Sequence, residues 1–249
     1  MKKILISCFL FSSLYGFGQD LLKSGPMLGY SEMREVMVWA QMNEPCIVEL
    51  VYWPDTLPDY EYRSAPQAAD PDQAYSVHLL ADSVQPGVKY GYDIYANGEN
   101  QTAARDLDFT AQPLWQYRTD PPRVKIALGS CAYLNEERYD RPGKGYGSNY
   151  GIFESIAADD PDMMLWLGDN IYLREADWFT RTGILARYSH FRALPELEDL
   201  WTTAHHYAIW DDHDYGPNDA VRSFPRKDLT LEAFKIFWAN NGYGVNELG

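Results

Sequence analysis

Apolar and polar residues follow two different patterns along the chain. From Met27 to about Phe109, short runs rich in β-branched and aromatic residues are separated by Pro, Gly and Asp, a pattern typical of strands joined by turns. These runs predict strands at 36–40, 47–53, 75–79 and 90–95. From Val124 onward, continuous apolar runs alternate with helix-like spacing. That alternation predicts an α/β domain whose sheet is covered on both faces.

The first pattern predicts a small antiparallel β-sandwich. Asn97-Gly98 follows the strand that ends at Tyr95, and this pair favours a type I′ turn because both of its positions need positive φ. Residues 84–92 resemble the tyrosine-corner segment of fibronectin type III-like domains, in which a tyrosine hydroxyl ties a strand to the preceding turn. This resemblance implies a fold and carries no function.

The second pattern has apolar runs at 124–128, 152–158, 163–167 and 206–210. Residues 230–240 have the spacing of an amphipathic helix, with Leu231, Phe234 and Phe237 on one face. A stretch with three prolines, 111–123, separates this part from the sandwich. We therefore expect a β-sandwich at 19–113, a linker at 114–123 and an α/β domain at 124–249.

The first eighteen residues have the pattern of a secretory signal peptide. Lys2 and Lys3 precede a mainly apolar run over 4–17, and polar residues follow. A membrane anchor is the alternative, but the run is shorter than the roughly 20 apolar residues of a spanning helix. We expect a signal peptide at 1–18 and a mature protein that begins near Gln19. Such a protein has no stable membrane anchor and is periplasmic or secreted.

Composition limits the classes of partner. Hydrophobic residues make up 46% of the 249 positions, which is too apolar for a disordered chain, and the formal net charge is −15. This charge argues against a nucleic-acid duplex as the main partner. Two cysteines, Cys46 and Cys131, lie outside the signal segment. They could pair in an oxidising compartment, although Cys46 opens an apolar run and is more typical of a buried thiol.

Polar residues follow three of the apolar runs at the point where each run ends. Cys131 follows the first run, Asp169 and Tyr172 follow the second, and the four residues 211–214, Asp-Asp-His-Asp, follow the third. The carboxyl ends of strands in an open α/β sheet line one crevice, so these groups can converge. The pair Gly168-Asp169 taken alone is equally typical of a strand-to-turn transition. Adjacent carboxylates repel one another, so the third cluster favours ligation over a solvated turn.

Thiolate, phenolate, carboxylate and imidazole groups together suit a site of mixed hardness. A trivalent metal would take the anionic ligands, and a harder divalent ion would take oxygens. Asp169 is placed to bridge two such ions. Paired ions activate water and clamp the oxygens of a phosphoryl group, so this donor set predicts hydrolysis of a phosphate ester.

These residues resemble the PhoD-like metallophosphatases, the alkaline phosphatase D family. The resemblance rests on LGSC at 128–131, DMMLWLGDNIY at 162–172 and YAIWDDHDYGPND at 207–219. It implies a two-sheet sandwich flanked by helices for the α/β part. It also implies that Cys131 and Tyr172 bind Fe³⁺, and that Asp169 bridges this ion to a divalent ion, often Ca²⁺. Asp212 and His213 fall where the family places ligands or phosphate-contacting groups, and Asn218 is a weaker metal-ligand candidate.

The resemblance implies an exported phosphoesterase that hydrolyses small phosphate esters with a metal-activated hydroxide. Asp169, Asp212 and His213 would be its catalytic residues. The part of the chain after Val124 is short for this fold, so we expect a C-terminally truncated form, either a fragment or a natural variant. The alternatives are an inactive binding or scaffold protein and a hydrolase of another ester, such as a lactone or a sulfate ester. Substrate identity, metal identity and oligomeric state stay open.

Overall fold

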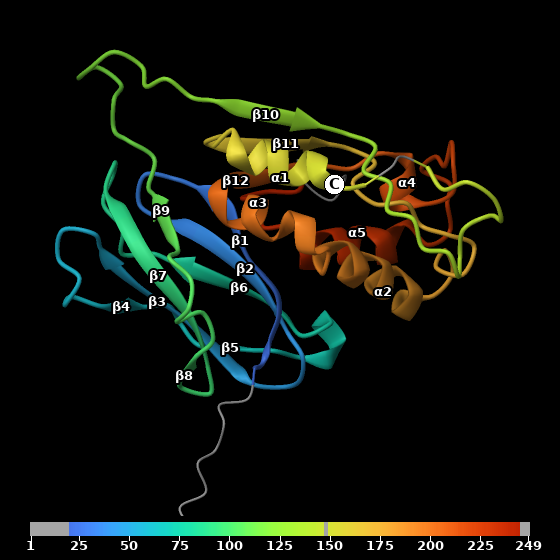
Figure 1. The fold of residues 1–249 in the computed structure, drawn as a ribbon, viewed down its shortest axis with the longest axis horizontal. Helices are drawn as coiled ribbons and strands as arrows, with labels where there is room; N and C mark the ends of the chain where they lie inside the picture. Colours follow the sequence, from blue (N-terminus) through green and yellow to red (C-terminus); the bar gives the residue numbers. More distant parts are fainter. Residues whose placement is uncertain (1–19, 147–148, 245–249) are drawn as a thin grey trace, which may run out of the picture.

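The computed structural model describes residues 20–146 and 149–244. The predicted signal peptide lies outside these residues. The strands of the first part are β1 (Leu22–Ser31), β2 (Val36–Met42), β3 (Ile47–Pro54), β4 (Tyr62–Arg63), β5 (Gln67–Ala68), β6 (Ser76–Ala81), β7 (Lys89–Ala96), β8 (Glu99–Asn100) and β9 (Asp108–Thr110). Figure 1 shows this part, in blue and green, beside the second part, which runs from yellow-green at β10 to red.

The first part is an antiparallel β-sandwich, as predicted. One sheet has the order β1-β2-β6, and the other has the order β4-β3-β7-β8, with β5 on β3 and β9 on β7. Apolar side chains from both sheets form one core. The turn at Asn97 and Gly98 has φ values of 49° and 83°, which confirms the prediction of positive φ at both positions. The Gln85 backbone N–H donates to the Tyr90 hydroxyl at 2.9 Å, so a tyrosine does tie β7 to the preceding turn.

The second part is an α/β arrangement built on a parallel sheet with the order β10-β11-β12. Its strands are β10 (Ile126–Gly129), β11 (Met163–Leu167) and β12 (His205–Ile209), and its α-helices are α1 (Gly151–Ala158), α2 (Arg181–Arg192), α3 (Glu198–Thr203), α4 (Asp212–Tyr215) and α5 (Lys227–Phe237). Short 3₁₀ helices lie at Pro71–Gln73 and Pro195–Leu197. None of the helices in the described part of the chain has the length and apolar character needed to cross a membrane.

One face of the parallel sheet packs against helices. Met164, Trp166 and Ala208 are buried together with apolar residues of α1, α2, α3 and α5. Trp166 is the centre of this packing, with its ring 5.6 Å from that of Trp201 and 5.5 Å from that of Trp238. This face is therefore a closed core.

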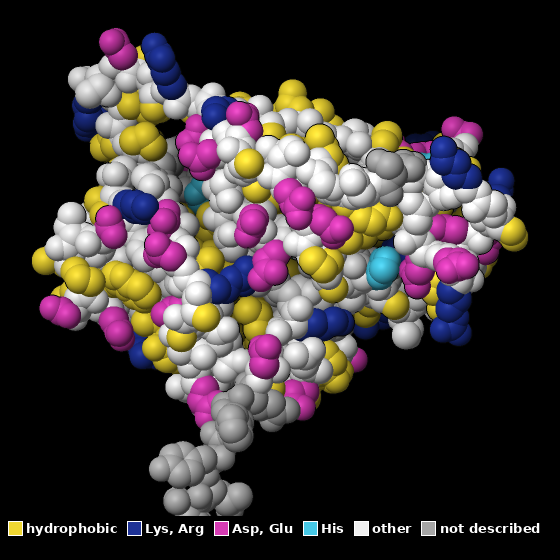
Figure 2. Space-filling model, viewed as in Figure 1, with side chains coloured by type: hydrophobic (Ala, Val, Ile, Leu, Met, Phe, Trp, Pro, Cys, Tyr) yellow, Lys and Arg dark blue, Asp and Glu magenta, His cyan; other side chains and the backbone are white. Residues whose placement is uncertain are grey.

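The other face of the same sheet is bare among the described residues, so the expectation of a sheet covered on both faces is wrong for this part of the chain. Ile126, Leu128, Leu167 and Ile209 are 48%, 63%, 43% and 59% exposed. The sequence pattern alone could not distinguish the two cases, because the strands are apolar on both faces. Hydrophobic side chains appear along the upper edge of Figure 2, where β10 lies.

The two parts share a core and hydrogen bonds. Met27 and Trp39 of the sandwich are buried in the core of the second part, and the Trp39 indole N–H donates to the Ile236 carbonyl at 2.8 Å. The Tyr30 backbone N–H donates to the Ala239 carbonyl at 2.9 Å. This pairing explains why α5 ends earlier than predicted: residues 238–240 leave the helix and run alongside β1 and the edge of β12.

Candidate metal centre

The carboxyl ends of the three parallel strands bring the predicted groups together. Leu167 of β11 is in register with Ile209 of β12, and Gly129 of β10 is in register with Trp166. The chain turns sharply after β10 and β11, where Cys131 and Asp169 adopt left-handed φ values of 60° and 50°. Such conformations cost free energy and are typical of functional sites.

Gly168 allows the two loops to approach each other closely. Its φ is 91°, and a Cβ at this position would lie 2.6 Å from the Cβ of Asp211. A larger residue would force the end of β11 away from the end of β12. The Asn170 side-chain N–H completes this junction by donating to the Ile209 carbonyl at 2.7 Å.

Asp169 is the centre of the cluster. One ligand atom each from Asp169, Asp212 and His213 lie within 4.8 Å of one another. The Tyr172 hydroxyl donates to Asp169 Oδ2 at 3.1 Å, and Cys131 Sγ lies 3.7 Å from the same oxygen. The His213 backbone N–H donates to the other oxygen, Oδ1, at 3.3 Å. Four of the other five predicted site residues therefore lie around the Asp169 carboxylate. Asp169 is buried, whereas Cys131 is exposed.

The acidic run after β12 divides into ligand-like and structural residues. The Asp211 side chain caps α4 by accepting the Asp212 backbone N–H at 2.9 Å. Asp214 is fully buried and accepts the backbone N–H groups of Asn170 and Asp211 at 3.0 and 2.9 Å. Burial raises the pKa of Asp214 to about 7, although these backbone hydrogen bonds act in the opposite direction. Asp211 and Asp214 thus hold the loops, and Asp212 and His213 face the cluster.

The chemistry of the donors fits a metal centre. Burial raises the pKa of Tyr172 well above its usual value, and hydrogen bonding to Cys131 and the charge of Asp169 add to this effect. The phenol therefore stays neutral unless a cation offsets the nearby negative charge. Asn170 Oδ1 is buried with no hydrogen-bond partner among the described residues. A buried acceptor of this kind is available to a cation or to water.

Asn218 does not join the cluster. Its side-chain N–H donates to Asp219 Oδ2 at 2.6 Å, and the residue is exposed after the end of α4. It lines a cavity beside the cluster instead. Both cysteines among the described residues, Cys46 and Cys131, are free, and Cys46 is buried, as its apolar surroundings predicted.

Sequence reasoning missed the arginine that holds the loop after Cys131. Arg174 is 6% exposed, and its side chain donates to Asp140 Oδ1 at 2.8 Å and to the Leu134 carbonyl at 2.7 Å. It also donates to the Tyr172 carbonyl, so it links this loop to the loop after β11. An arginine in a polar stretch has no periodicity that would reveal burial, so the pattern offered no way to find it.

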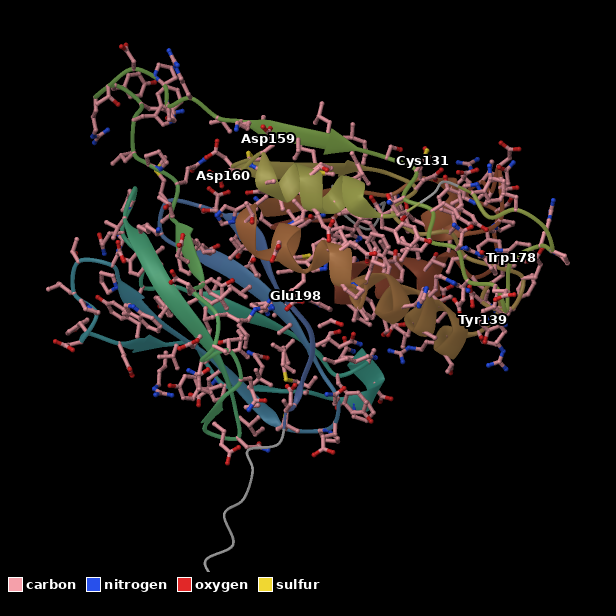
Figure 3. All side chains as sticks on the ribbon, in the orientation of Figure 1. Cys131, Tyr139, Asp159, Asp160, Trp178 and Glu198 are labelled. Carbon is pink, nitrogen blue, oxygen red and sulfur yellow. The ribbon has the colours of Figure 1, made fainter. Side chains whose placement is uncertain are left out.

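Figure 3 shows Cys131, Trp178 and Tyr139 at the same end of the molecule.

Comparisons with known proteins agree with the motifs. No family model matches the chain. The chain is 23% identical over 190 residues to alkaline phosphatase D of Bacillus subtilis (strain 168), which covers 70% of this chain and 30% of that protein. Its fold matches a solved structure of PhoD with a TM-score of 0.70 and 19% identity, covering 88% of this chain and 46% of that one. The chain thus spans less than half the length of these two proteins. The resemblance predicted from three short motifs is confirmed: the chain is similar to alkaline phosphatase D in sequence and to PhoD in fold.

Proposed function

We propose that this protein is a metal-dependent phosphoric ester hydrolase. The observation that carries the proposal is the convergence of a thiol, a phenol, a second carboxylate and an imidazole around the carboxylate of Asp169. Similarity to alkaline phosphatase D supports the same class of reaction. The proposed substrate is a small phosphate ester. We also propose that residues 1–18 direct export to the periplasm or the medium.

The donors divide between two proposed ions. Cys131 and Tyr172 supply the softer and phenolic ligands that suit Fe³⁺. The Asp212 carboxylate suits Ca²⁺ or another hard divalent ion, and the His213 imidazole suits a divalent transition metal or a phosphoryl oxygen. Asp169 lies between the two groups and is the proposed bridge. Bound ions would supply Lewis acidity, which lowers the pKa of water and neutralises charge on the phosphoryl oxygens.

The chain's own residues orient this chemistry. Tyr172 and the backbone of His213 hydrogen-bond to opposite oxygens of Asp169 and so fix the plane of its carboxylate. The rings of Tyr172 and His213 pack with their centroids 4.2 Å apart. Both rings line the neighbouring cavity, so His213 can bind a phosphoryl oxygen of an ester held there. Asp214 keeps both loops in place through backbone hydrogen bonds.

The test combines metal content with turnover. We expect the purified mature chain to contain iron and a second divalent ion, measured by mass spectrometry, and to hydrolyse 4-nitrophenyl phosphate or its bis-ester. Asp169→Asn should lower kcat by at least about 100-fold, because the bridge loses its charge. Asp159→Asn is the matched control, since this carboxylate is exposed and lies outside the cluster. Full activity in Asp169→Asn, or no activity and no bound metal in the wild type, would contradict the proposal; the latter would favour a binding or scaffold protein.

A further inference from the structure

A large cavity opens beside the metal cluster. Its volume is about 740 Å³, and Tyr172 and His213 belong both to its wall and to the cluster. Much of the remaining wall is aromatic, because Tyr133, Tyr139, Tyr146 and Trp178 also line it. A site for a small polar phosphate ester alone would not require this much aromatic surface.

We propose that this cavity binds the leaving group of the substrate and selects esters whose leaving group carries a planar aromatic ring, such as a nucleobase. This inference rests on the proposed phosphoesterase function and adds a substrate class to it. Phosphate would bind at the cluster, and the ring would enter the cavity. Tyr139 is the specificity-determining residue that the geometry identifies.

The aromatic wall is continuous from the cluster into the cavity. The Tyr172 ring lies 4.2 Å from that of His213 and 4.8 Å from that of Tyr133, centroid to centroid. Tyr133 in turn lies 5.0 Å from Tyr146. These distances are those of aromatic pairs in contact. A planar group attached to a phosphoryl group at the cluster would therefore meet ring surfaces along its path.

The wall is held rigidly by buried arginines. The Arg174 guanidinium lies 4.2 Å from the centroid of the Tyr133 ring and donates to Asp140. Arg187, which is 5% exposed, donates to Asp177 Oδ2 at 2.8 Å and to Glu136 at 2.5 Å, so it ties the loop after Cys131 to α2. Because the rings are already positioned, ligand binding costs little conformational entropy for ordering them.

Tyr139 offers ring surface to a ligand. It lines the cavity and is 38% exposed. The guanidinium groups of Arg138 and Arg187 lie 5.4 and 5.5 Å from its ring centroid and orient the ring. Arg141 lines the same cavity and forms no ion pair with any residue of the described chain. An unpaired guanidinium can form a cation–π contact with an aromatic leaving group and a charge-assisted hydrogen bond to the phosphate of the same ester.

Two substrates with the same ester bond provide the test. Adenosine 5′-phosphate and ribose 5-phosphate both release a 5′-alcohol and differ in the base. We expect the wild type to have the higher kcat/KM for adenosine 5′-phosphate. Tyr139→Ala should lower the ratio of the two kcat/KM values about tenfold, within the range measured for base–aromatic stacking. Tyr139→Phe should keep the ratio, because it keeps the ring.

The control is Tyr117→Ala, which removes a fully exposed tyrosine from outside the cavity and should leave the ratio unchanged. Comparing 2-naphthyl phosphate with adenosine 5′-phosphate distinguishes a plain aryl group from a nucleobase. Equal kcat/KM values for both ribose esters, or a ratio that Tyr139→Ala leaves intact, would overturn the inference. If no ester is hydrolysed, the proposed function fails, and binding measured by calorimetry tests the cavity separately. Tighter binding of adenosine 5′-phosphate than of ribose 5-phosphate, with the difference lost in Tyr139→Ala, would still support an aromatic-binding cavity.

Discussion

The sandwich and the parallel sheet use their strands in opposite ways. In the sandwich, both sheets turn apolar faces towards a common core, and residues such as Val38, Leu50 and Ile94 are completely buried. Among the described residues, the parallel sheet buries only the face around Trp166, and its strand ends carry Cys131, Asp169 and the acidic run. The sandwich thus supplies closed packing, whereas the left-handed turns and converging carboxylates at the ends of the parallel strands lower the stability of the second part.

Removing Trp166 should have the largest effect on folding. Trp166→Ala should lower the free energy of unfolding by about 3–5 kcal/mol, because it opens a cavity among Trp201, Trp238 and the helices. Urea denaturation followed by circular dichroism measures this loss. Since Met27 and Trp39 share that core, the loss should appear in one transition for the whole chain. Two separate transitions, with the sandwich unchanged, would show that the parts fold independently.

Alanine substitutions at two glycines with positive φ compare the cost of an added Cβ in the two parts of the molecule. Gly168→Ala should cost about 3 kcal/mol, because φ is 91° and the new Cβ would clash with Asp211. Gly98→Ala, in the sandwich hairpin, is the matched variant: its φ is 83°, but no described atom lies within 4 Å of the added Cβ. It should cost only about 1 kcal/mol. Chemical denaturation of both variants gives the comparison, and equal costs would mean that the loops can separate freely.

The parallel sheet should also make stability sensitive to acid. His206 is fully buried, accepts the Trp166 indole N–H at 2.9 Å and lies 2.9 Å from the Leu200 carbonyl, so its ring is neutral. Burial lowers its pKa to about 3, against 6.5 in an unperturbed histidine. The stabilisation is therefore complete above pH 6.5 and is lost as the pH falls towards 3, by about 1.4 kcal/mol per pH unit.

His206→Gln should flatten this dependence, because glutamine cannot be protonated. The measurement is the free energy of unfolding at pH 7 and pH 5 for each variant. His190→Gln is the control, since the His190 side chain is 42% exposed, and it should keep the wild-type slope. The prediction fails if both variants lose stability equally between the two pH values.

Local chemistry explains which features the sequence could predict. Asn97-Gly98 and the segment ending in Tyr90 predicted a turn and a hydroxyl tie, because both depend on residues close in the chain. The cluster around Asp169 could also be predicted, because parallel strands bring their carboxyl ends together.

Other features depend on contacts between distant residues. Helix α2 was hidden because two of its buried residues are Arg187 and Arg192, which break the apolar pattern. Strand β1 contains Gly25 and Pro26, which disguise it as a turn. Asp214 looked like a ligand in sequence but hydrogen-bonds to the backbone of a loop more than 40 residues away. Partners of this kind are set by the tertiary fold, so no spacing rule reveals them.

The bare face of the parallel sheet should show the smallest effect on stability. Leu128→Ser and Ile209→Thr should each change the free energy of unfolding by less than about 0.5 kcal/mol, because these side chains are 63% and 59% exposed. Leu50→Ser, on a fully buried sandwich position, is the contrasting variant and should cost several times more. Urea denaturation at several protein concentrations measures all three. A large, concentration-dependent loss in Leu128→Ser would mean that this face is covered by association in solution, and the contrast between the two parts would then apply to the isolated chain alone.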